Sequence, residues 1–193
     1  MLQNNPKIIA VFGGSRVPAH SPEYHEAYTI GKLLAQRGWI VMNGGYQGTM
    51  EASARGAREN GGKTIGVLSG EFAGLAPNPF LDETITSADL FSRIREMYQR
   101  ANGFIVLKGS MGTLAELALV WNLAKIGNQT KPIILLGKGW NAVLRAWQEH
   151  LAVTDEEAKL LHVVARPEDA VELMMHILGN GTLPSPRAPS SAT

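Results

Sequence analysis

The sequence predicts an α/β protein: a single doubly wound, mostly parallel sheet with helices on both faces. Two observations predict this class. Short apolar runs alternate with longer amphipathic segments along nearly the whole chain, as strands and helices do in successive βαβ units. Glycine clusters follow three of these runs, at 13–14, 44–48 and 109–112. Such turns are expected at the carboxyl ends of parallel strands, where these folds bind ligands at the point of strand-order reversal.

The first half of the chain is expected to alternate strictly between strand and helix. The run IIAVF within 7–12 indicates a strand. Ser21-Pro22-Glu23 then supplies a helix cap, a proline at the first helical position and an acid in the first turn. This helix continues to about Arg37, where Gly38 ends it. The next three elements are a strand, a helix and a strand: 39–43, 50–60 and 63–68.

The second half begins with a long connection. Residues 69–81 carry two glycines and two prolines, and a loop of about a dozen residues is typical of a lid or substrate loop. The run 104–107 is short and wholly apolar, as in a parallel strand covered on both faces. A helix opening at Thr113 and ending near Ile126 follows it, with apolar residues at helical spacing. The remaining expected elements are strands at 83–86, 132–136 and 161–164 and helices at 89–101, 141–150 and 167–178.

Length and composition predict one domain. The chain has 193 residues, of which 45% are hydrophobic, enough for a sizeable core. We expect residues 1–178 to form a Rossmann-like nucleotide-binding domain. Residues 179–193 are rich in Gly, Pro and Ser, and we expect a disordered tail there.

Charge and residue usage exclude several functional classes. The net charge of +1 gives no reason to expect nucleic acid or a membrane surface as partner. The absence of cysteine excludes disulfides, thiolate catalysis and cysteine-bound zinc. The first residues lack a signal-peptide core, and no run reaches membrane-spanning length, so we expect a cytoplasmic protein. The five histidines show no metal-ligand spacing, and the sequence indicates neither a metal nor a cofactor.

The glycine turns are candidate phosphate sites. Glycines let the backbone approach a ligand closely, and the free N–H groups of the helix that follows point at a bound anion. Two of the turns share a Gly-Thr pair that opens a helix, so two helix starts could hold one phosphate together. The expected phosphate- or nucleotide-binding residues are Gly14, Ser15, Gly44, Gly45, Gly48, Thr49, Gly109, Ser110, Gly112 and Thr113.

Glu116 allows a second, purely structural interpretation. Thr113-Leu114-Ala115-Glu116 fits a capping box, in which the glutamate would only accept a hydrogen bond from the Thr113 amide. Pattern alone leaves this interpretation and a functional one open.

Four segments together resemble the LONELY GUY (LOG) family of nucleoside 5′-monophosphate phosphoribohydrolases, often mislabelled as lysine decarboxylases. The resemblance covers nearly the whole chain before the tail. Val11–Ser15 is similar to the family's VFCGSS, and Gly44–Met50 to its GGGxxGLMG. Arg93–Met97 resembles the R-K-x-x-M segment, and Gly109–Glu116 resembles most of the P-G-G-x-G-T-x-x-E signature.

The resemblance implies an N-glycosidase. The family's catalytic arginine and glutamate fall on Arg93 and Glu116, and the implied reaction releases a free base and ribose 5-phosphate from a small-molecule nucleoside monophosphate. Cytokinin riboside monophosphates are one substrate class of the family. An oxocarbenium-like transition state suits a nearby carboxylate, and an arginine suits a phosphate or carboxylate partner. The resemblance also implies a homodimer or higher homo-oligomer whose helices pack beside the active sites.

Departures from the family pattern leave an alternative open. Lys108 replaces the proline of the signature, Ser110 its second glycine, and Ile94 the lysine of R-K-x-x-M. The alternative is a non-enzymatic carrier similar to the molybdenum cofactor carrier proteins, which bind a phosphorylated pterin without turnover. Retention of both Arg93 and Glu116 favours the enzyme.

Overall fold

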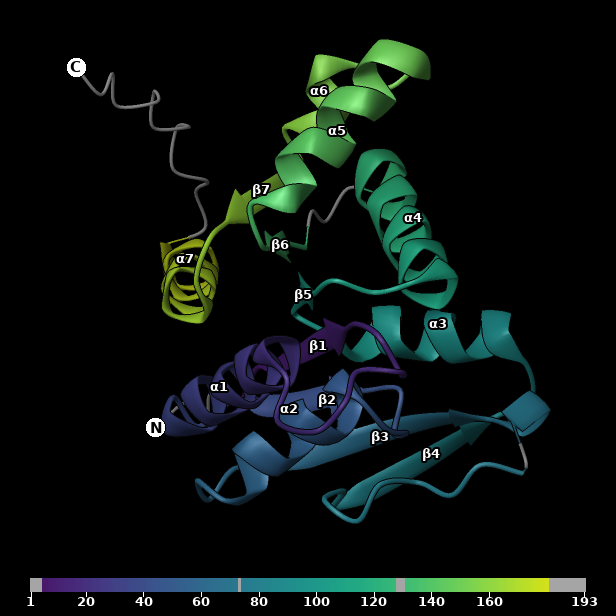
Figure 1. Cartoon of the computed structure of the whole chain (residues 1–193), viewed down its shortest axis with the longest axis vertical. Coiled ribbons are helices and arrows are strands. Elements are labelled where there is room, and N and C mark those ends of the chain that lie inside the picture. Colours follow the sequence, from purple (N-terminus) through teal and green to yellow (C-terminus); the bar gives the residue numbers. More distant parts are fainter. Residues whose placement is uncertain (1–4, 73, 128–130, 181–193) are drawn as a thin grey trace.

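A computed structural model describes residues 5–72, 74–127 and 131–180 and contains one seven-stranded sheet. The strand order is β4-β3-β2-β1-β5-β6-β7, and every pairing is parallel (Figure 1). Strands β2, β3 and β4 are thus added in turn on one side of β1. The chain then crosses to the other side of β1, where β5, β6 and β7 are added. This is the predicted doubly wound α/β fold, with the strand order reversing between β1 and β5.

All seven strands match the sequence prediction to within one residue at each end; β3 starts and ends one residue late, and β5 is shifted one residue toward the N-terminus. Apart from β4 at the edge of the sheet, their short length and mainly apolar composition agree with strands covered on both faces. The seven strands are β1 Ile8–Phe12, β2 Ile40–Asn43, β3 Thr64–Ser69, β4 Glu83–Ser87, β5 Gly103–Val106, β6 Ile133–Leu136 and β7 Leu161–Val164.

The helices also follow the prediction, with six differences. The sequence prediction missed α6 and the 3₁₀ turn η1. It placed the starts of α4 and α5 and the end of α2 two residues late, and the end of α7 two residues early. Residues 181–193 of the expected tail lie outside the described part of the chain. The helices are α1 Pro22–Gln36, α2 Thr49–Arg58, η1 Gly70–Phe72, α3 Leu90–Arg100, α4 Met111–Ile126, α5 Gly139–His150, α6 Asp155–Ala158 and α7 Pro167–Asn180.

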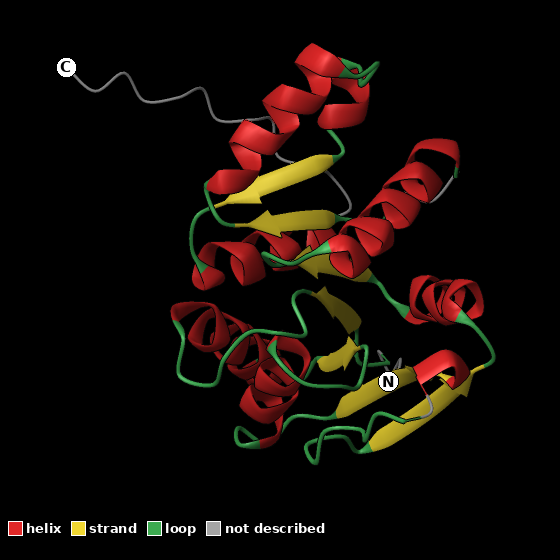
Figure 2. Cartoon of the chain, turned by 45° about the vertical axis from the view of Figure 1, so that its right-hand side comes forward, coloured by secondary structure: helices red, strands yellow, loops and turns green. Residues whose placement is uncertain are grey.

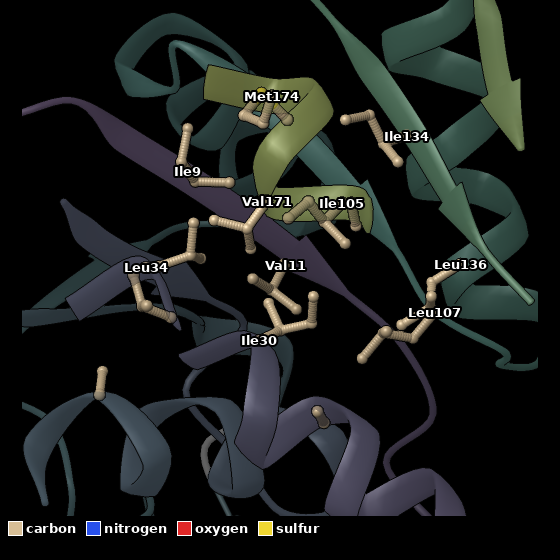
Figure 3. Close-up of a cluster of buried hydrophobic side chains, with 14 of the residues drawn as sticks. Ile9, Val11, Ile30, Leu34, Ile105, Leu107, Ile134, Leu136, Val171 and Met174 are labelled. Atoms are coloured by element: carbon tan, nitrogen blue, oxygen red, sulfur yellow. The ribbon is translucent and has the colours of Figure 1, made fainter. Parts of the chain in front are cut away.

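One face of the sheet is covered by α1, α2 and α7. Alternate residues of the central strands point to this side, because successive side chains of a strand face opposite ways. Ile9 and Val11 of β1 pack there with Ile30 and Leu34 of α1 and with Met174 of α7 (Figure 3). All five side chains are fully buried, or nearly so.

The opposite face is covered by α3, α4 and α5. In Figure 1, α3 and α4 lie on the right and α5 lies above them near the centre; Figure 2 shows the molecule with its right-hand side turned forward. Phe12 of β1 and Phe104 of β5 stack with their ring centroids 5.6 Å apart. Met97 of α3 and Leu117 of α4 close over them without exposed surface. This packing fixes α3 and α4 side by side, and their N-terminal turns carry the candidate catalytic residues.

None of the helices within the described residues is both long and apolar enough to span a bilayer.

Candidate functional site

A cavity of about 270 Å³ opens at the carboxyl edge of the sheet, beside the β1–β5 switch point. Segments that follow β1, β2, β3 and β5 meet there, together with the first turns of α3 and α4. The lining residues are Val11, Phe12, Gly13, Ser15, Gly44, Tyr46, Met50, Phe72, Leu75, Leu90, Arg93, Ser110, Gly112, Thr113 and Glu116.

The structure brings seven of the twelve expected site residues to this cavity. They are Ser15, Gly44, Arg93, Ser110, Gly112, Thr113 and Glu116. The other five do not line the cavity but belong to the turns that support it: Gly14, Gly45, Gly48, Thr49 and Gly109.

Backbone contacts among these supporting residues join the turns. The Gly14 N–H donates to the Lys108 carbonyl over 3.2 Å, and the Gly14 carbonyl accepts from the Thr49 N–H over 3.0 Å. Gly48 has a φ of +69°, and a Cβ there would lie 2.3 Å from the Gly14 carbonyl oxygen. Only glycine therefore fits at position 48. The three turns form one connected support at the switch point.

Asn43, which the sequence does not mark as a site residue, holds the second glycine turn (44–48) in place through its side chain. It is fully buried at the end of β2, and its side-chain oxygen accepts the Gly45 N–H over 2.8 Å. Its amide donates to the Met50 carbonyl over 2.8 Å and to Ser53 over 3.1 Å. A buried asparagine with its hydrogen bonds satisfied holds the turn in one conformation.

Arg93 lies inside the protein rather than in solvent. Its residue exposure is 5%, and its Nε donates to the Val67 carbonyl of β3 over 2.7 Å. Its Nη1 lies 3.3 Å from Oε1 of Glu116, and its guanidinium carbon lies 6.0 Å from the Tyr46 ring centroid. The guanidinium thus reaches from β3 to α4 across the cavity wall and retains further N–H donors.

Glu116 is the carboxylate of the site, and it is not a helix cap. The helix begins at Met111 with Ser110 as its N-cap residue, so Glu116 lies in the second turn and faces Arg93. The capping-box interpretation is wrong because the helix starts two residues before Thr113. Burial raises the pKa of Glu116 to about 7, although Arg93 opposes the rise by favouring the carboxylate. A carboxyl group with such a pKa can take up or release a proton near neutral pH.

Two of the three helix starts beside the cavity, those of α2 and α4, lack side-chain caps. Ser110 makes no side-chain capping bond at α4, and Gly48 has no side chain to offer at α2. By contrast, Ser21, Asp89 and Thr154 cap α1, α3 and α6. The start of α5 is also uncapped but does not line the cavity. First-turn N–H groups of α4 are therefore available to an anion.

The polarity of the cavity lining differs between the two sides of the cavity. Glycine, serine and threonine residues gather in the turns after β1 and β5, next to Val11 and Phe12 of β1, whereas the segments after β2 and β3 contribute mainly apolar side chains. The apolar lining consists of Tyr46, Met50, Phe72 and Leu75, with Leu90 from α3. The sequence predicts a lid or substrate loop at 69–81 but singles out none of these side chains, because an apolar residue in a loop is not distinctive until its neighbours are known.

Ser110 and Lys108, the two residues that depart from the glycine-rich signature, differ in their position relative to the cavity. Ser110 lines the cavity, whereas Lys108 does not. The Lys108 side chain is 81% exposed, and its Nζ lies 3.2 Å from Oε1 of Glu23 in the first turn of α1. A surface pair of this kind contributes little to stability.

A second hollow of about 350 Å³ lies at the amino edge of the sheet, away from the switch point. Its lining includes Lys7, Arg37 and Trp39 but no carboxylate among the described residues. It lacks the paired acid and base groups of the first cavity, which is therefore the better candidate site.

Comparison with known proteins gives two groups of relatives. A family model described as SLOG cluster4 matches residues 6–171. A cytokinin riboside 5′-monophosphate phosphoribohydrolase of Mycobacterium marinum is 35% identical over 163 residues, covering 80% of this chain and 87% of that protein.

Among solved structures, the molybdenum cofactor binding protein of Rippkaea orientalis superposes with a TM-score of 0.72 at 26% identity. The match covers 91% of this chain and 99% of that one. The molybdenum cofactor carrier protein of Chlamydomonas reinhardtii gives a TM-score of 0.69 at 28% identity, with the same coverage.

Proposed function

The chain belongs to the SLOG cluster4 family, and from that premise we propose that it is a nucleoside 5′-monophosphate phosphoribohydrolase. It hydrolyses the N-glycosidic bond and releases the free base and ribose 5-phosphate. The LOG resemblance seen in the sequence is confirmed by this family match and by the mycobacterial relative. That relative's name specifies a phosphoribohydrolase, which supports the same reaction class here.

The observation that carries the proposal is the buried pair of Glu116 and Arg93. Glu116 lies on α4, whose uncapped start suits the 5′-phosphate, and Arg93 extends toward the apolar side, which suits the base. A nucleotide lying across the cavity would then place its ribose beside Glu116. A carboxyl group whose pKa is about 7 is suited to proton transfer at that position.

The chemistry follows from this arrangement. Water adds through its oxygen to C1′ while the C1′–N bond breaks, and the bonding electrons leave with the base. Positive charge develops on the ribose, and the carboxylate of Glu116 stabilises it and accepts a proton from the attacking water. The departing base takes up a proton from solvent, and Glu116 later returns the proton that it accepted to solvent, so the reaction consumes one water and no net proton.

Arg93 has a supporting role in this scheme. Its contact with Glu116 favours the carboxylate form, which the reaction requires, against the cost of burial. Its remaining N–H groups can donate to the substrate. The Val67 carbonyl holds the guanidinium in place through Nε, so the arginine is oriented before the ligand arrives.

The test is incubation of the purified protein with a panel of nucleoside 5′-monophosphates, cytokinin riboside monophosphates included, while free base is measured. Release of base from at least one member, abolished in Glu116→Gln, supports the proposal. Release that is equal in wild type and Glu116→Gln would reject the assigned role of Glu116.

The second candidate is a non-enzymatic carrier of a phosphorylated ligand. It is favoured by the likeness to the molybdenum cofactor binding and carrier proteins over nine-tenths of the chain. A carrier would bind through the same cavity without cleaving. If calorimetry shows tight binding of nucleotides or of a phosphorylated pterin and no base is released, the carrier function takes precedence.

A further inference from the structure

Tyr46 forms a fixed aromatic wall at the apolar end of the cavity. Its residue exposure is 6%, and its hydroxyl accepts the Ser69 N–H over 3.2 Å. Asn78 donates to its backbone carbonyl over 2.9 Å. The ring is therefore held from both the side chain and the backbone, and it cannot turn away without breaking these bonds.

Phe72 extends this wall outward. Its ring meets that of Tyr46 edge to face, with centroids 5.8 Å apart and an angle of 82° between the ring planes. Phe72 is 38% exposed although it belongs to the cavity lining, so part of its ring faces open space. Edge-to-face pairs have a defined geometry, so the two rings form one preformed surface.

The polar groups beside this wall are already engaged. Arg93 lies 6.0 Å from the Tyr46 ring centroid, but its Nε donates to Val67, its Nη1 donates to Glu116 and its Nη2 lies against the backbone of Gly44. The other members of the apolar lining are Met50, Leu75 and Leu90. Tyr46 alone carries a polar group, and Ser69 occupies it. Asn78 lies nearby, but its amide and its oxygen are bonded to the Tyr46 carbonyl and the Phe80 N–H.

We propose that Tyr46 and Phe72 form a base subsite that recognises a planar heterocycle by its shape and ring face rather than by its polar substituents. The inference rests on the proposed nucleotide ligand and names its class: purine nucleoside monophosphates, accepted with little regard to which purine they carry. Stacking on an aromatic side chain tolerates different bases because each has a similar ring face. An apolar pocket also rejects a polar substituent only weakly, whereas a hydrogen-bonding pocket discriminates strongly.

The experiment measures binding by calorimetry, so that its result does not depend on turnover. The ligands are adenosine, guanosine and cytidine 5′-monophosphates and ribose 5-phosphate. The variants are Tyr46→Ala and Phe72→Ala, with Tyr46→Phe to keep the ring and remove the hydroxyl. Phe80→Ala is the matched control, because Phe80 belongs to the same loop, lies against Arg55 and does not line the cavity.

We expect wild type to bind the two purine monophosphates within about tenfold of each other, and cytidine monophosphate more weakly because one ring covers less surface. Tyr46→Ala and Phe72→Ala should weaken both purine ligands by about ten- to a hundredfold and leave ribose 5-phosphate unchanged. Phe80→Ala should bind as wild type does. Tyr46→Phe keeps the ring but loses the Ser69 hydrogen bond that fixes it, so it should weaken the purine ligands less than Tyr46→Ala does. Phe72 is partly exposed, so its variant tests the subsite even if Tyr46→Ala fails to fold.

Three results would overturn the inference. One is discrimination between adenosine and guanosine monophosphates by more than about a hundredfold, which would require a hydrogen-bonded base edge. Another is an equal loss of ribose 5-phosphate and purine ligands in the alanine variants, and the third is unchanged purine affinity in both. If the expected binding pattern holds while no base is ever released, the subsite stands and the proposed hydrolase function falls.

Discussion

The guanidinium of Arg93 lies directly against the backbone of Gly44. A Cβ added at Gly44 would fall 1.8 Å from Nη2 of Arg93 and 2.6 Å from the sulfur of Met50. Because Gly44, directly after β2, has no side chain, the guanidinium has room to extend from the Val67 carbonyl of β3 to Glu116. The second glycine turn (44–48) therefore makes room for the pair of Arg93 and Glu116, in addition to its expected role in binding an anion.

Gly44→Ala tests this relationship. The new methyl should push the guanidinium away from Glu116, and overpacking of this kind typically costs about 1–3 kcal/mol of stability. We expect turnover to fall by about a hundredfold, because small displacements of positioned groups have effects of that size. Gly139→Ala is the control, since a Cβ there meets no atom within 4 Å. Base-release rates and urea unfolding of both variants provide the measurement, and undiminished turnover in Gly44→Ala would contradict the assigned role of the Arg93 position.

Glu116→Gln separates catalysis from binding. The amide keeps the shape of the side chain and removes its charge, so turnover should fall by about two orders of magnitude or more. Nucleotide affinity should hold or rise slightly, because a carboxylate near a phosphorylated ligand repels it. Base release and calorimetric affinity are measured side by side, and a wild-type hydrolysis rate would show that Glu116 takes no part in the reaction.

Arg93→Ala provides a contrast within the same pair. It removes donors to the ligand and also leaves the Val67 carbonyl without its partner, so both affinity and turnover should fall.

The raised pKa of Glu116 predicts a pH-dependent stability. The folded-state pKa is about 7 against an unfolded value of 4.5, so between these values the folded protein binds more protons than the unfolded chain. The free energy of unfolding should therefore fall as the pH rises from about 4.5 to about 7, by up to about 3 kcal/mol from this group. Urea unfolding of wild type and Glu116→Gln at pH 5 and pH 8 isolates the contribution. The variant should gain stability relative to wild type at pH 8, and a difference that does not change with pH would contradict the assignment.

Most of the fold could be predicted because local signals agree with the final structure. Every strand except the edge strand β4 is a short, mainly apolar run, and glycine follows both α1 and the helix before β3, so these elements are visible in the sequence. The exceptions lack such signals. Helix α6 has four residues and no apolar run, although Thr154 and Glu157 form a capping box. Helix α4 starts early because Ser110, in extended backbone, takes the N-cap position that was assigned to Thr113.

The site was predictable only in part, for a different reason. Glycine turns and the residues of a catalytic pair form patterns that are visible in the sequence. Tyr46 and Phe72, by contrast, form one surface only in the folded protein, where Ser69 and Asn78 hydrogen-bond the long loop to Tyr46. Asn43 likewise has no visible role until its amide reaches Met50 and Ser53. These contacts join residues distant in the chain, and no local periodicity encodes them.

The uncapped start of α4 predicts that activity requires the 5′-phosphate. Its first-turn N–H groups can hold an anion, and hydrogen bonds to a charged group are stronger than those to a neutral one. A nucleoside should therefore be turned over with a kcat/KM about a hundredfold or more below that of its monophosphate. Inorganic phosphate should compete with the nucleotide. Equal turnover of nucleoside and monophosphate would reject the phosphate site.

The outward face of α4 is unusually apolar for a surface helix. Met111 and Ile126 are 76% and 68% exposed, and with Ala115, Ala118 and Asn122 they form one stripe at helical spacing. Phe91, at the start of the neighbouring α3, is 76% exposed. Arg93, by contrast, faces inward, so the candidate interface belongs to the outer sides of these helices and not to the catalytic arginine.

We expect this stripe to pack against a second copy of the chain, as the homodimers implied by the LOG resemblance do. Ala118→Glu places a charge at the centre of the stripe, where it costs little in a monomer but must be desolvated in a dimer. Ala146→Glu is the matched control, an exposed alanine within α5. Light scattering should give the mass of a dimer or larger assembly for wild type and Ala146→Glu, and a smaller mass for Ala118→Glu. A monomeric wild type at working concentration would contradict the prediction, and an Ala118→Glu protein that keeps the wild-type mass would place the interface elsewhere.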